Sequence, residues 1–380
     1  MKLKYKAPLI VFVVTLLTSA IATYVDYSFH RNLVENAEQK ELKEVASFIQ
    51  NDIVRESHKV MGITSLITTQ PWIIKAFKEG NKDLLTSSLT ESFALQKNSN
   101  HINTAKFWHS PATVFLNLYN PKDSDKDESS YRSMVLAANL QKQAARGIEV
   151  GSTSLAIRGV EPIVDGDEFI GSFEVGTSFA LVLKAVQQNL KFHAAVFVED
   201  DVLSNRGIMA NINAPEDQIA GYRLLQATDS NFIKNVVSSD LLSSVNDIIT
   251  KTTKIQGKNY GIVLVPLLDY TGVQIGSIVA ARNFSELSSS FNKSIVADVL
   301  FCLVQSALLS FITFVTFSTL VISPLQKIRN NMKKLINGDM NAQDSVSQRK
   351  DTIGKLERTY FKLKNHLKTG RSDAANTTKS

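Results

Sequence analysis

Charged and aromatic residues between positions 108 and 174 could bind a small polar molecule. Arg132 and Arg158 could each hold a carboxylate through two parallel hydrogen bonds, because a planar guanidinium matches carboxylate geometry. Glu149 or Glu174 could hold an amine. Four ring side chains could form the walls of such a pocket: Trp108, His109, Tyr119 and Tyr131. These residue types predict a ligand with a carboxylate or an amine.

Each of these residues also has an ordinary structural interpretation. Arg158 could pair with Glu149 or Glu161, Trp108 could belong to the core, and Glu174 could face water on its strand. The alternatives differ in their consequences, because breaking a buried ion pair costs roughly 3–5 kcal/mol, whereas losing a ligand contact leaves the fold intact. The sequence leaves both open.

No pattern typical of an enzyme accompanies these residues. The six histidines lack metal-ligand spacing with one another or with the single cysteine: His30, His58, His101, His109, His193 and His366. Asp123, Asp125 and Asp127 resemble a calcium loop, but Glu128 occupies the sixth position, where glycine is needed. We therefore expect no catalytic residue, no metal, no cofactor and no enzymatic activity.

Two apolar segments, 7–25 and 297–322, are long enough to cross a membrane. Residues 1–6 carry three lysines and no acid, and from Ser323 onward thirteen Lys or Arg oppose five acids. The whole chain is +6, so the middle carries −5. Basic flanks on both ends predict that both ends are cytoplasmic and the middle is periplasmic, as in a multi-pass protein of the bacterial inner membrane. The excess of basic residues is thus explained by the membrane topology, and we expect no nucleic acid partner.

The first apolar segment has an alternative interpretation as a cleaved signal peptide, with Ala20-Ile21-Ala22 as the cleavage site. Against it, no proline or glycine occurs from Val25 to Met61, and apolar residues recur there at helical spacing. We therefore expect a stalk helix over 26–66 that leaves the membrane without a break. The lone Cys302 lies in the second apolar segment, so the exterior part has no disulfide.

The exterior part contains an internal repeat. Pro162-Ile163-Val164-Asp165 and a following Ile170-Gly171-Ser172 recur about 104 positions later as Pro266-Leu267-Leu268-Asp269 and Ile275-Gly276-Ser277. Each copy predicts a β-hairpin with glycine in its turn. The repeat predicts two copies of one fold, with a chance match as the alternative.

The surrounding pattern predicts α+β lobes on antiparallel sheets. We expect strands within 112–119, 154–158, 194–198 and 260–266, and helices over 131–145, 179–188, 217–227 and 240–251. Residues Phe107–Gly176 resemble the membrane-distal half of a double Cache sensor domain. The matching residues are Pro111, Phe115-Leu116, Arg132, Gly147–Gly151, Ile157–Val160, Pro162, Gly171 and Glu174–Gly176. Where that family often has Arg and Trp, this chain has Asn117 and Tyr119.

The resemblance implies two tandem PAS/Cache-like lobes behind the stalk helix. We expect a membrane-distal lobe over 67–192 and a membrane-proximal lobe over 193–296. Which lobe binds the ligand is not fixed by the sequence.

Residues 323–369 are similar to a HAMP domain, a short parallel helix pair that dimerises and transmits signals. Both helices have apolar residues at heptad spacing, which favours a homodimer. The residues expected to carry transmission are Pro324, Leu325, Ile328, Leu335, Gly338, Asp339, Asp351, Ile353, Gly354, Leu356 and Leu363. Thr352 stands where HAMP domains usually have Glu, and the alternative is a basic helix lying on anionic lipid.

Residues 370–380 are polar, and we expect a disordered tail there. These observations favour a homodimeric membrane receptor that senses an extracytoplasmic small molecule and signals to a separate cytoplasmic partner. The alternatives are a scaffold that docks another periplasmic protein, and a truncated chemoreceptor, sensor kinase or diguanylate cyclase. Stabilisation of the exterior domain by a small ligand separates the receptor from the scaffold.

Overall fold

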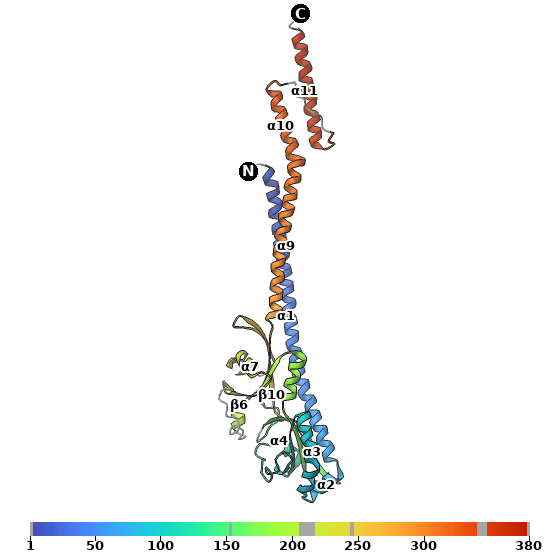
Figure 1. Cartoon of the computed structure of the whole chain (residues 1–380), viewed down its shortest axis with the longest axis vertical. Helices are drawn as coiled ribbons and strands as arrows, with labels where there is room; N and C mark the ends of the chain where they lie inside the picture. The colour runs from blue at the N-terminus through green and yellow to red at the C-terminus, as the bar shows by residue number, and fades with distance from the viewer. Residues whose placement is uncertain (1–2, 152–153, 205–216, 244–246, 340–347, 378–380) are drawn as a thin grey trace. The chain divides into compact units, whose positions relative to one another are not determined.

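The computed structural model describes residues 3–151, 154–204, 217–243, 247–339 and 348–377 (Figure 1). The chain forms two units. One comprises Leu33–Ser288, and the other comprises Met1–Asn32 with Ser289–Ser380.

The helix α1 (Leu3–Thr68) begins in one unit and continues through the other. No proline or glycine interrupts α1 from Val25 to Met61, which explains its length, so the expected stalk helix is confirmed. Within the unit Leu33–Ser288, its apolar stripe is buried from Leu42 to Ile49 and again at Val60.

The first lobe follows α1 and is built on a five-stranded antiparallel sheet in the order β2-β1-β5-β4-β3. Its elements are α2 (Pro71–Lys78), α3 (Lys82–Asn100), β1 (Ile102–His109), β2 (Thr113–Asn117), α4 (Ser133–Leu140), β3 (Ala145–Val150), β4 (Leu155–Asp165) and β5 (Glu168–Thr177). One face of the sheet packs on α1, α2 and α3 through a core that includes Phe77, Phe107 and Phe173. A smaller core around Trp108 and Val135 joins the other face to α4.

The second lobe is built on a six-stranded sheet in the order β7-β8-β6-β11-β10-β9. The elements from the end of the first lobe are α5 (Ala180–Ala185), η1 (Val186–Leu190), β6 (His193–Glu199), α6 (Asp200–Ser204), β7 (Gln218–Ile219), β8 (Tyr222–Ala227), α7 (Ser230–Val236), α8 (Ser239–Ser243), β9 (Ile249–Ile255), β10 (Lys258–Leu268) and β11 (Gln274–Asn283). One core of apolar residues is shared by α1, both lobes and α5.

The two sheets confirm the internal repeat. The hairpins β4–β5 and β10–β11 consist of interior strands of their sheets, and each turn contains a glycine with positive φ, Gly166 or Gly272. The glycine of each Ile-Gly-Ser lies against a neighbouring strand. A Cβ on Gly171 would lie 2.4 Å from the Trp108 carbonyl oxygen, and one on Gly276 would lie 2.1 Å from that of Phe197. The expected α+β class with two Cache-like lobes is therefore confirmed.

Some expected helices are wrong. Residues 217–227 form strands β7 and β8, because Ala220 and Gly221 adopt positive φ and make a tight turn. In the segment 240–251 the helix α8 (Ser239–Ser243) covers only the first residues; residues 244–246 lie outside the described part, and β9 then pairs with β10. The helix expected over 131–145 is confined to α4 and is followed by Lys142 at φ 58°.

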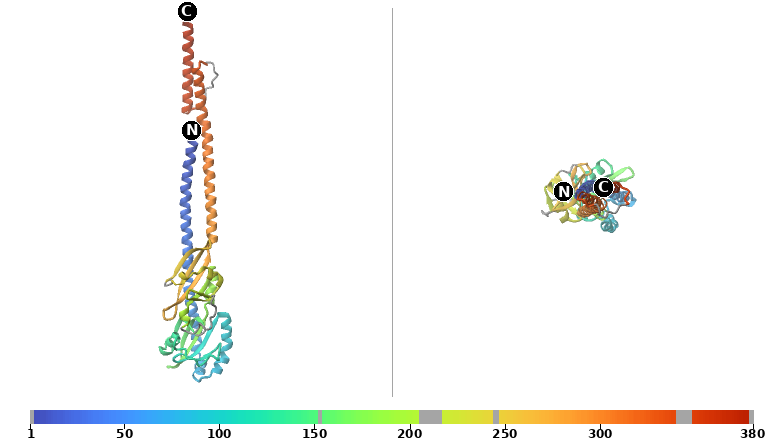
Figure 2. Two further views of the ribbon diagram at one scale, coloured as in Figure 1. Left: turned by 90° about the vertical axis from the view of Figure 1, so that its left-hand side faces the viewer. Right: turned by 90° about the horizontal axis from the view of Figure 1, so that it is seen from above.

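The other unit contains α9 (Ser285–Phe317) from Ser289 onward, η4 (Ser318–Ile322), α10 (Ser323–Ile336) and α11 (Thr352–Thr377). Two helical stretches in the described residues, Leu9–Thr68 and Ile295–Ile336, are long and apolar enough to cross a membrane. The first part of α1 and α9 lie side by side (Figure 1, Figure 2), with Thr23 Oγ1 and Cys302 Sγ 3.4 Å apart. Residues 340–347, between the two helices of the expected HAMP domain, lie outside the described residues. The helix α11 continues past residue 370, where we expected disorder.

Candidate functional site

A cluster of buried charges lies on the face of the first sheet that α4 covers. Because side chains alternate along a strand, Phe107, Val175 and Ile157 face the opposite, apolar side. The charged face carries Lys106 on β1, Glu149 on β3, Arg158 on β4 and Glu174 on β5. Arg132, just before α4, and Glu128 complete what we call the charged cluster: Lys106, Arg132, Arg158, Glu128, Glu149 and Glu174.

Arg132 connects all three carboxylates of the charged cluster and is only 1% exposed. Its Nε donates to Glu149 Oε2 at 2.8 Å, its Nη1 to Glu128 Oε2 at 3.1 Å, and its Nη2 to Glu174 Oε1 at 2.5 Å. Glu149 Oε1 also accepts a hydrogen bond from the Met134 backbone N–H at 2.9 Å, so it caps the start of α4. Arg132 thereby fixes the helix to the sheet.

Arg158 lies on the sheet beneath Arg132. Its Nη1 donates to Glu174 Oε1 at 2.6 Å and to Thr104 Oγ1 at 3.2 Å. Its Nε and Nη2 donate to the carbonyl oxygens of Glu149 and Ser154. The expected partners of Arg158 were Glu149 or Glu161. Its carboxylate partner is instead Glu174, because the two residues lie on neighbouring strands of the same face.

The remaining contacts join the cluster to an aromatic ring. Trp108 is fully buried, and its Nε1 donates to Glu174 Oε2 at 3.0 Å. Lys106 Nζ is 3.2 Å from Glu128 Oε1 and 5.2 Å from the centre of the Trp108 ring. Arg132 Cζ lies 4.8 Å from the same ring. Glu174 therefore has full burial and does not face water, and Trp108 is a core residue with a polar contact.

Burial alone would raise the pKa of Glu174, but the neighbouring Arg132 and Arg158 outweigh it and hold this pKa at about 2. Burial alone would likewise lower the pKa of Arg132, and the charges of Glu174, Glu149 and Glu128 raise it instead. The cluster contains three basic and three acidic side chains. Its net charge is zero, which is the condition under which buried ions persist.

Three expected pocket residues lie outside the cluster. His109 packs on Phe77, with ring centres 5.0 Å apart, and burial lowers its pKa. The Tyr119 hydroxyl donates to the Phe93 carbonyl oxygen at 2.9 Å, and burial raises its pKa. Tyr131 is half-buried, and its backbone N–H bonds to Glu128.

Sequence reasoning missed Lys106 and Glu128. Lys106 stands two residues before Trp108, and strand alternation alone could have placed it on the same face. Glu128 gives no such signal, because it lies in a loop. Two buried polar atoms near this face, Ser172 Oγ and Asn139 Oδ1, have no hydrogen-bond partner within the described residues.

The second lobe has no equivalent of this arrangement at the matched strand positions. Ser172 pairs with Trp108 and Pro162, and Ser277 pairs with Phe197 and Pro266. Counting along the strands from these serines matches four of the residues with fully buried apolar ones: Trp108 with Phe197, Lys106 with Ala195, Arg158 with Ile262, and Glu174 with Val279. The same counting matches Glu149 with the half-buried Thr253.

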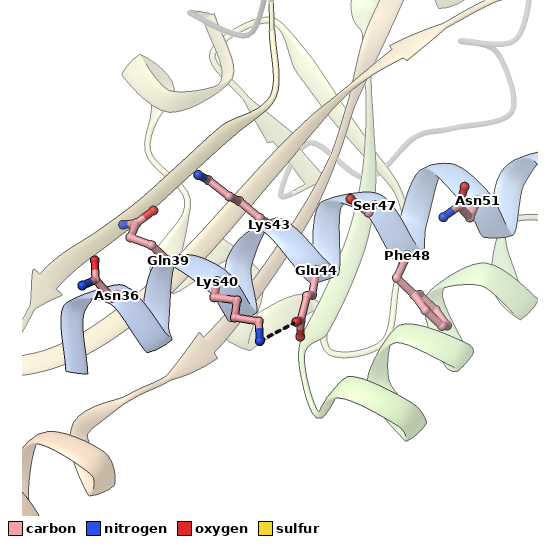
Figure 3. A pocket seen from close by; sticks show the side chains of 8 residues that line it. All are labelled: Asn36, Gln39, Lys40, Lys43, Glu44, Ser47, Phe48 and Asn51. Atoms are coloured by element: carbon pink, nitrogen blue, oxygen red, sulfur yellow. Dashed lines mark ion pairs between the residues drawn. The ribbon is translucent and has the colours of Figure 1, made fainter. Parts of the chain in front are cut away.

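The described cavities do not coincide with the charged cluster. An open groove of about 690 Å³ runs along α1 from Asn36 to Asn51 and is lined by that helix alone, with Lys40 Nζ 3.9 Å from Glu44 (Figure 3). A cavity of about 420 Å³ lies at α7, α8 and β9, and its lining includes Lys251 and Thr253. Among the residues described, no group of His, Cys, Asp and Glu could hold a metal ion.

The helices α10 and α11 run parallel. Tyr360 Oη donates to the Asn331 carbonyl oxygen at 3.3 Å, and Arg349 Nη2 donates to that of Leu320 at 2.8 Å. The two residues of each pair are 29 positions apart in the sequence. This constant offset shows that the two segments are aligned in parallel.

The expected transmission residues occupy different parts of this pair. Ile328 and Gly354 are buried within the protomer, whereas Leu356 and Leu363 are 42% and 50% exposed. Leu325, Leu335 and Ile353 are half-buried, Pro324 is in the first turn of α10, and Gly338 with φ 89° follows its end beside Asp339. Asp351 Oδ1 accepts a hydrogen bond from the Gly354 backbone N–H at 2.9 Å and caps α11.

Two tandem sheets of one topology behind a long helix define the class of double Cache sensor domains. The sequence profile described as the double sensory domain of two-component sensor kinase matches residues 35–313, and the chain belongs to this family. Cache sensor domains are extracellular parts of membrane receptors, and two apolar helices flank this one. No curated protein sequence is significantly similar to the chain.

Solved sensor domains have similar folds at low identity. The Vibrio cholerae histidine kinase DctB sensor domain is 10% identical, with a TM-score of 0.40 over 67% of this chain and 98% of that chain. The ligand-binding domain of the Campylobacter jejuni chemoreceptor Tlp3, in complex with 4-methylisoleucine, is 9% identical, with a TM-score of 0.41 over 74% and 94%. The E. coli DcuS sensor domain is 16% identical, with a TM-score of 0.30 over 36% and 98%.

Proposed function

We propose that this protein is a homodimeric receptor of the bacterial inner membrane that binds a small molecule at the charged cluster of its first lobe. The observation that carries the proposal is the contrast between matched positions. The second lobe builds the same sheet with Phe197, Ile262 and Val279 where the first lobe buries Trp108, Arg158 and Glu174. The fold therefore does not require the charges.

Buried ions are expensive to maintain, because replacing a buried ion pair with apolar residues is often neutral or stabilising by 1–4 kcal/mol. A binding role accounts for their presence. A ligand carboxylate could replace a glutamate on Arg132 or Arg158, and a ligand amine could replace a cation beside Glu174 or Glu149. A ligand with both groups would keep the cluster neutral. Replacing contacts of Arg132 would also displace α4, which Glu149 caps.

The experiment is a thermal-shift screen of the fragment 33–288, which forms a compact unit, with free amino acids and small carboxylates. A ligand at 100 times its dissociation constant should add about 2.7 kcal/mol to the free energy of unfolding. The matched control is the variant Trp108→Phe/Arg158→Ile/Glu174→Val, which copies the second lobe and should not respond. An equal shift in this variant would place the ligand elsewhere, and the cavity near Lys251 would then be tested.

We propose that α10 and α11 form a HAMP-like pair that dimerises in the cytoplasm and passes the signal to a separate output protein. The parallel register and the exposed Leu356, Leu363 and Leu367 support this role, because an unpartnered apolar seam on a parallel pair is buried by a second copy.

Cysteine crosslinking in membranes tests the seam. In a Cys302→Ser background, cysteine at Leu356 or Leu363 should crosslink between protomers much faster than cysteine at Lys334 or Lys362, which are exposed controls. Equal rates at all four positions would favour a helix that lies on lipid.

A further inference from the structure

The short segment η4, which joins α9 to α10, contains a backbone carbonyl without its α-helical donor. Pro324 has no N–H, so it cannot bond to the Leu320 carbonyl oxygen four residues earlier. The backbone responds by widening to a π-helix over Ser318–Ile322, and the Ser323 N–H bonds to the Ser318 carbonyl oxygen. This departure from α-helical geometry lies where the apolar helix ends.

Arg349, from the segment before α11, reaches this carbonyl. Its Nη2 donates to Leu320 O at 2.8 Å and to Asp351 Oδ2 at 2.7 Å, and its Nε donates to the same Oδ2 at 3.2 Å. The other oxygen of Asp351 caps α11 at Gly354. One guanidinium therefore joins the end of the apolar helix to the first turn of α11.

The backbone of Arg349 is held from the other side. Its carbonyl oxygen accepts a hydrogen bond at 2.6 Å from Nη1 of Arg358, in the second turn of α11. Gly354 is required for this approach, because a Cβ there would lie 2.2 Å from the same oxygen. The Asp-x-Ile-Gly sequence thus serves a specific contact: Asp351 orients the guanidinium, and Gly354 makes room for the Arg349 backbone.

We propose that Arg349 is a clasp that couples α11 directly to the end of the second membrane helix, independently of the covalent path through α10 and the connector. When α9 shifts or rotates, the Leu320 carbonyl moves, and α11 either follows through Arg349 or the clasp opens. The clasp and the Tyr360–Asn331 bond together set the register of α11 on α10. The signalling consequence rests on the proposed transmission role of this pair, whereas the clasp itself does not.

The test is a distance measurement within one protomer. The full chain in lipid nanodiscs, in a Cys302→Ser background, carries spin labels at the exposed Asn330 and Thr359 and is diluted with unlabelled chain. Pulsed dipolar spectroscopy should give a narrow distance distribution for the unmodified clasp. Arg349→Ala should broaden it at least twofold, Arg349→Lys should restore it only in part because an ammonium lacks the fork, and the adjacent exposed Lys350→Ala should leave it unchanged.

The variant Gly354→Ala disrupts the same contact differently, because the added Cβ displaces the Arg349 backbone. It should broaden the distance distribution as Arg349→Ala does. An unchanged width in Arg349→Ala would overturn the clasp, whatever Gly354→Ala does. Circular dichroism of each variant shows that the helices persist; a loss of helicity in Arg349→Ala with a retained width in Gly354→Ala would also overturn it. Failure of the Leu356 crosslink would contradict the proposed dimer and leave the clasp result intact.

Discussion

The two lobes share a strand order, a hairpin of interior strands and a close-packed glycine, and they differ most on one sheet face. In the first lobe this face buries six charged side chains around Trp108, and in the second lobe it is an apolar core that includes Phe197, Ile262 and Val279. The same backbone thus accepts either a polar network or an apolar core. The comparison teaches that the charges are specific to the first lobe and are not a condition of the fold.

The largest expected effect comes from breaking the charged cluster on one side only. Arg158→Ala removes one of the two arginines that neutralise the fully buried Glu174, so it should lower the free energy of unfolding of the fragment 33–288 by about 3–5 kcal/mol. The control is the matched position in the second lobe, where Ile262→Val should cost only about 0.5–1.5 kcal/mol. Denaturant titration measures both. A melting temperature that Arg158→Ala leaves unchanged without ligand would show that the ion pair adds little to the fold.

A smaller effect should follow from pH. The pKa of Glu174 is about 2 in the folded protein against 4.5 for an ordinary glutamate, so its contribution is complete above pH 4.5 and is lost as pH falls toward 2. Between pH 7 and pH 3 this group alone should remove about 2 kcal/mol. The denaturant midpoint should fall less between pH 7 and pH 3 in the variant Trp108→Phe/Arg158→Ile/Glu174→Val than in the wild type. Equal losses in the two proteins would mean that other carboxylates set the acid sensitivity.

The smallest effect on stability is expected from copying the second lobe. The same triple variant removes one cation and one anion, so Lys106 and Arg132 still balance Glu128 and Glu149. The free energy of unfolding should stay within about 2 kcal/mol of the wild type, although three buried residues change. A loss as large as that of Arg158→Ala would indicate that the polar network contributes to the stability of the first lobe as a unit.

Several features were accessible from the sequence. The hairpins at Gly166 and Gly272 follow from alternation and turn chemistry, and Arg132, Arg158, Glu149, Glu174 and Trp108 do come together. The helix predictions for residues 217–227 and 240–251 were wrong, because the apolar spacing of these segments fits a helix as well as a strand. Only pairing with a neighbouring strand decides between the two.

By itself the sequence determined the two apolar helices, the unbroken stalk, the repeated hairpin and the residues from which a polar site could be built. These properties depend on composition and local periodicity, which the chain carries in every conformation. Only the tertiary structure decided that Arg158 meets Glu174, that Lys106 and Glu128 join them, and that His109 and Tyr119 do not. Alternation along a strand predicts which side chains share a face of the sheet. Whether α4 or α1 covers that face depends on contacts between residues far apart in the chain, which the local pattern does not contain.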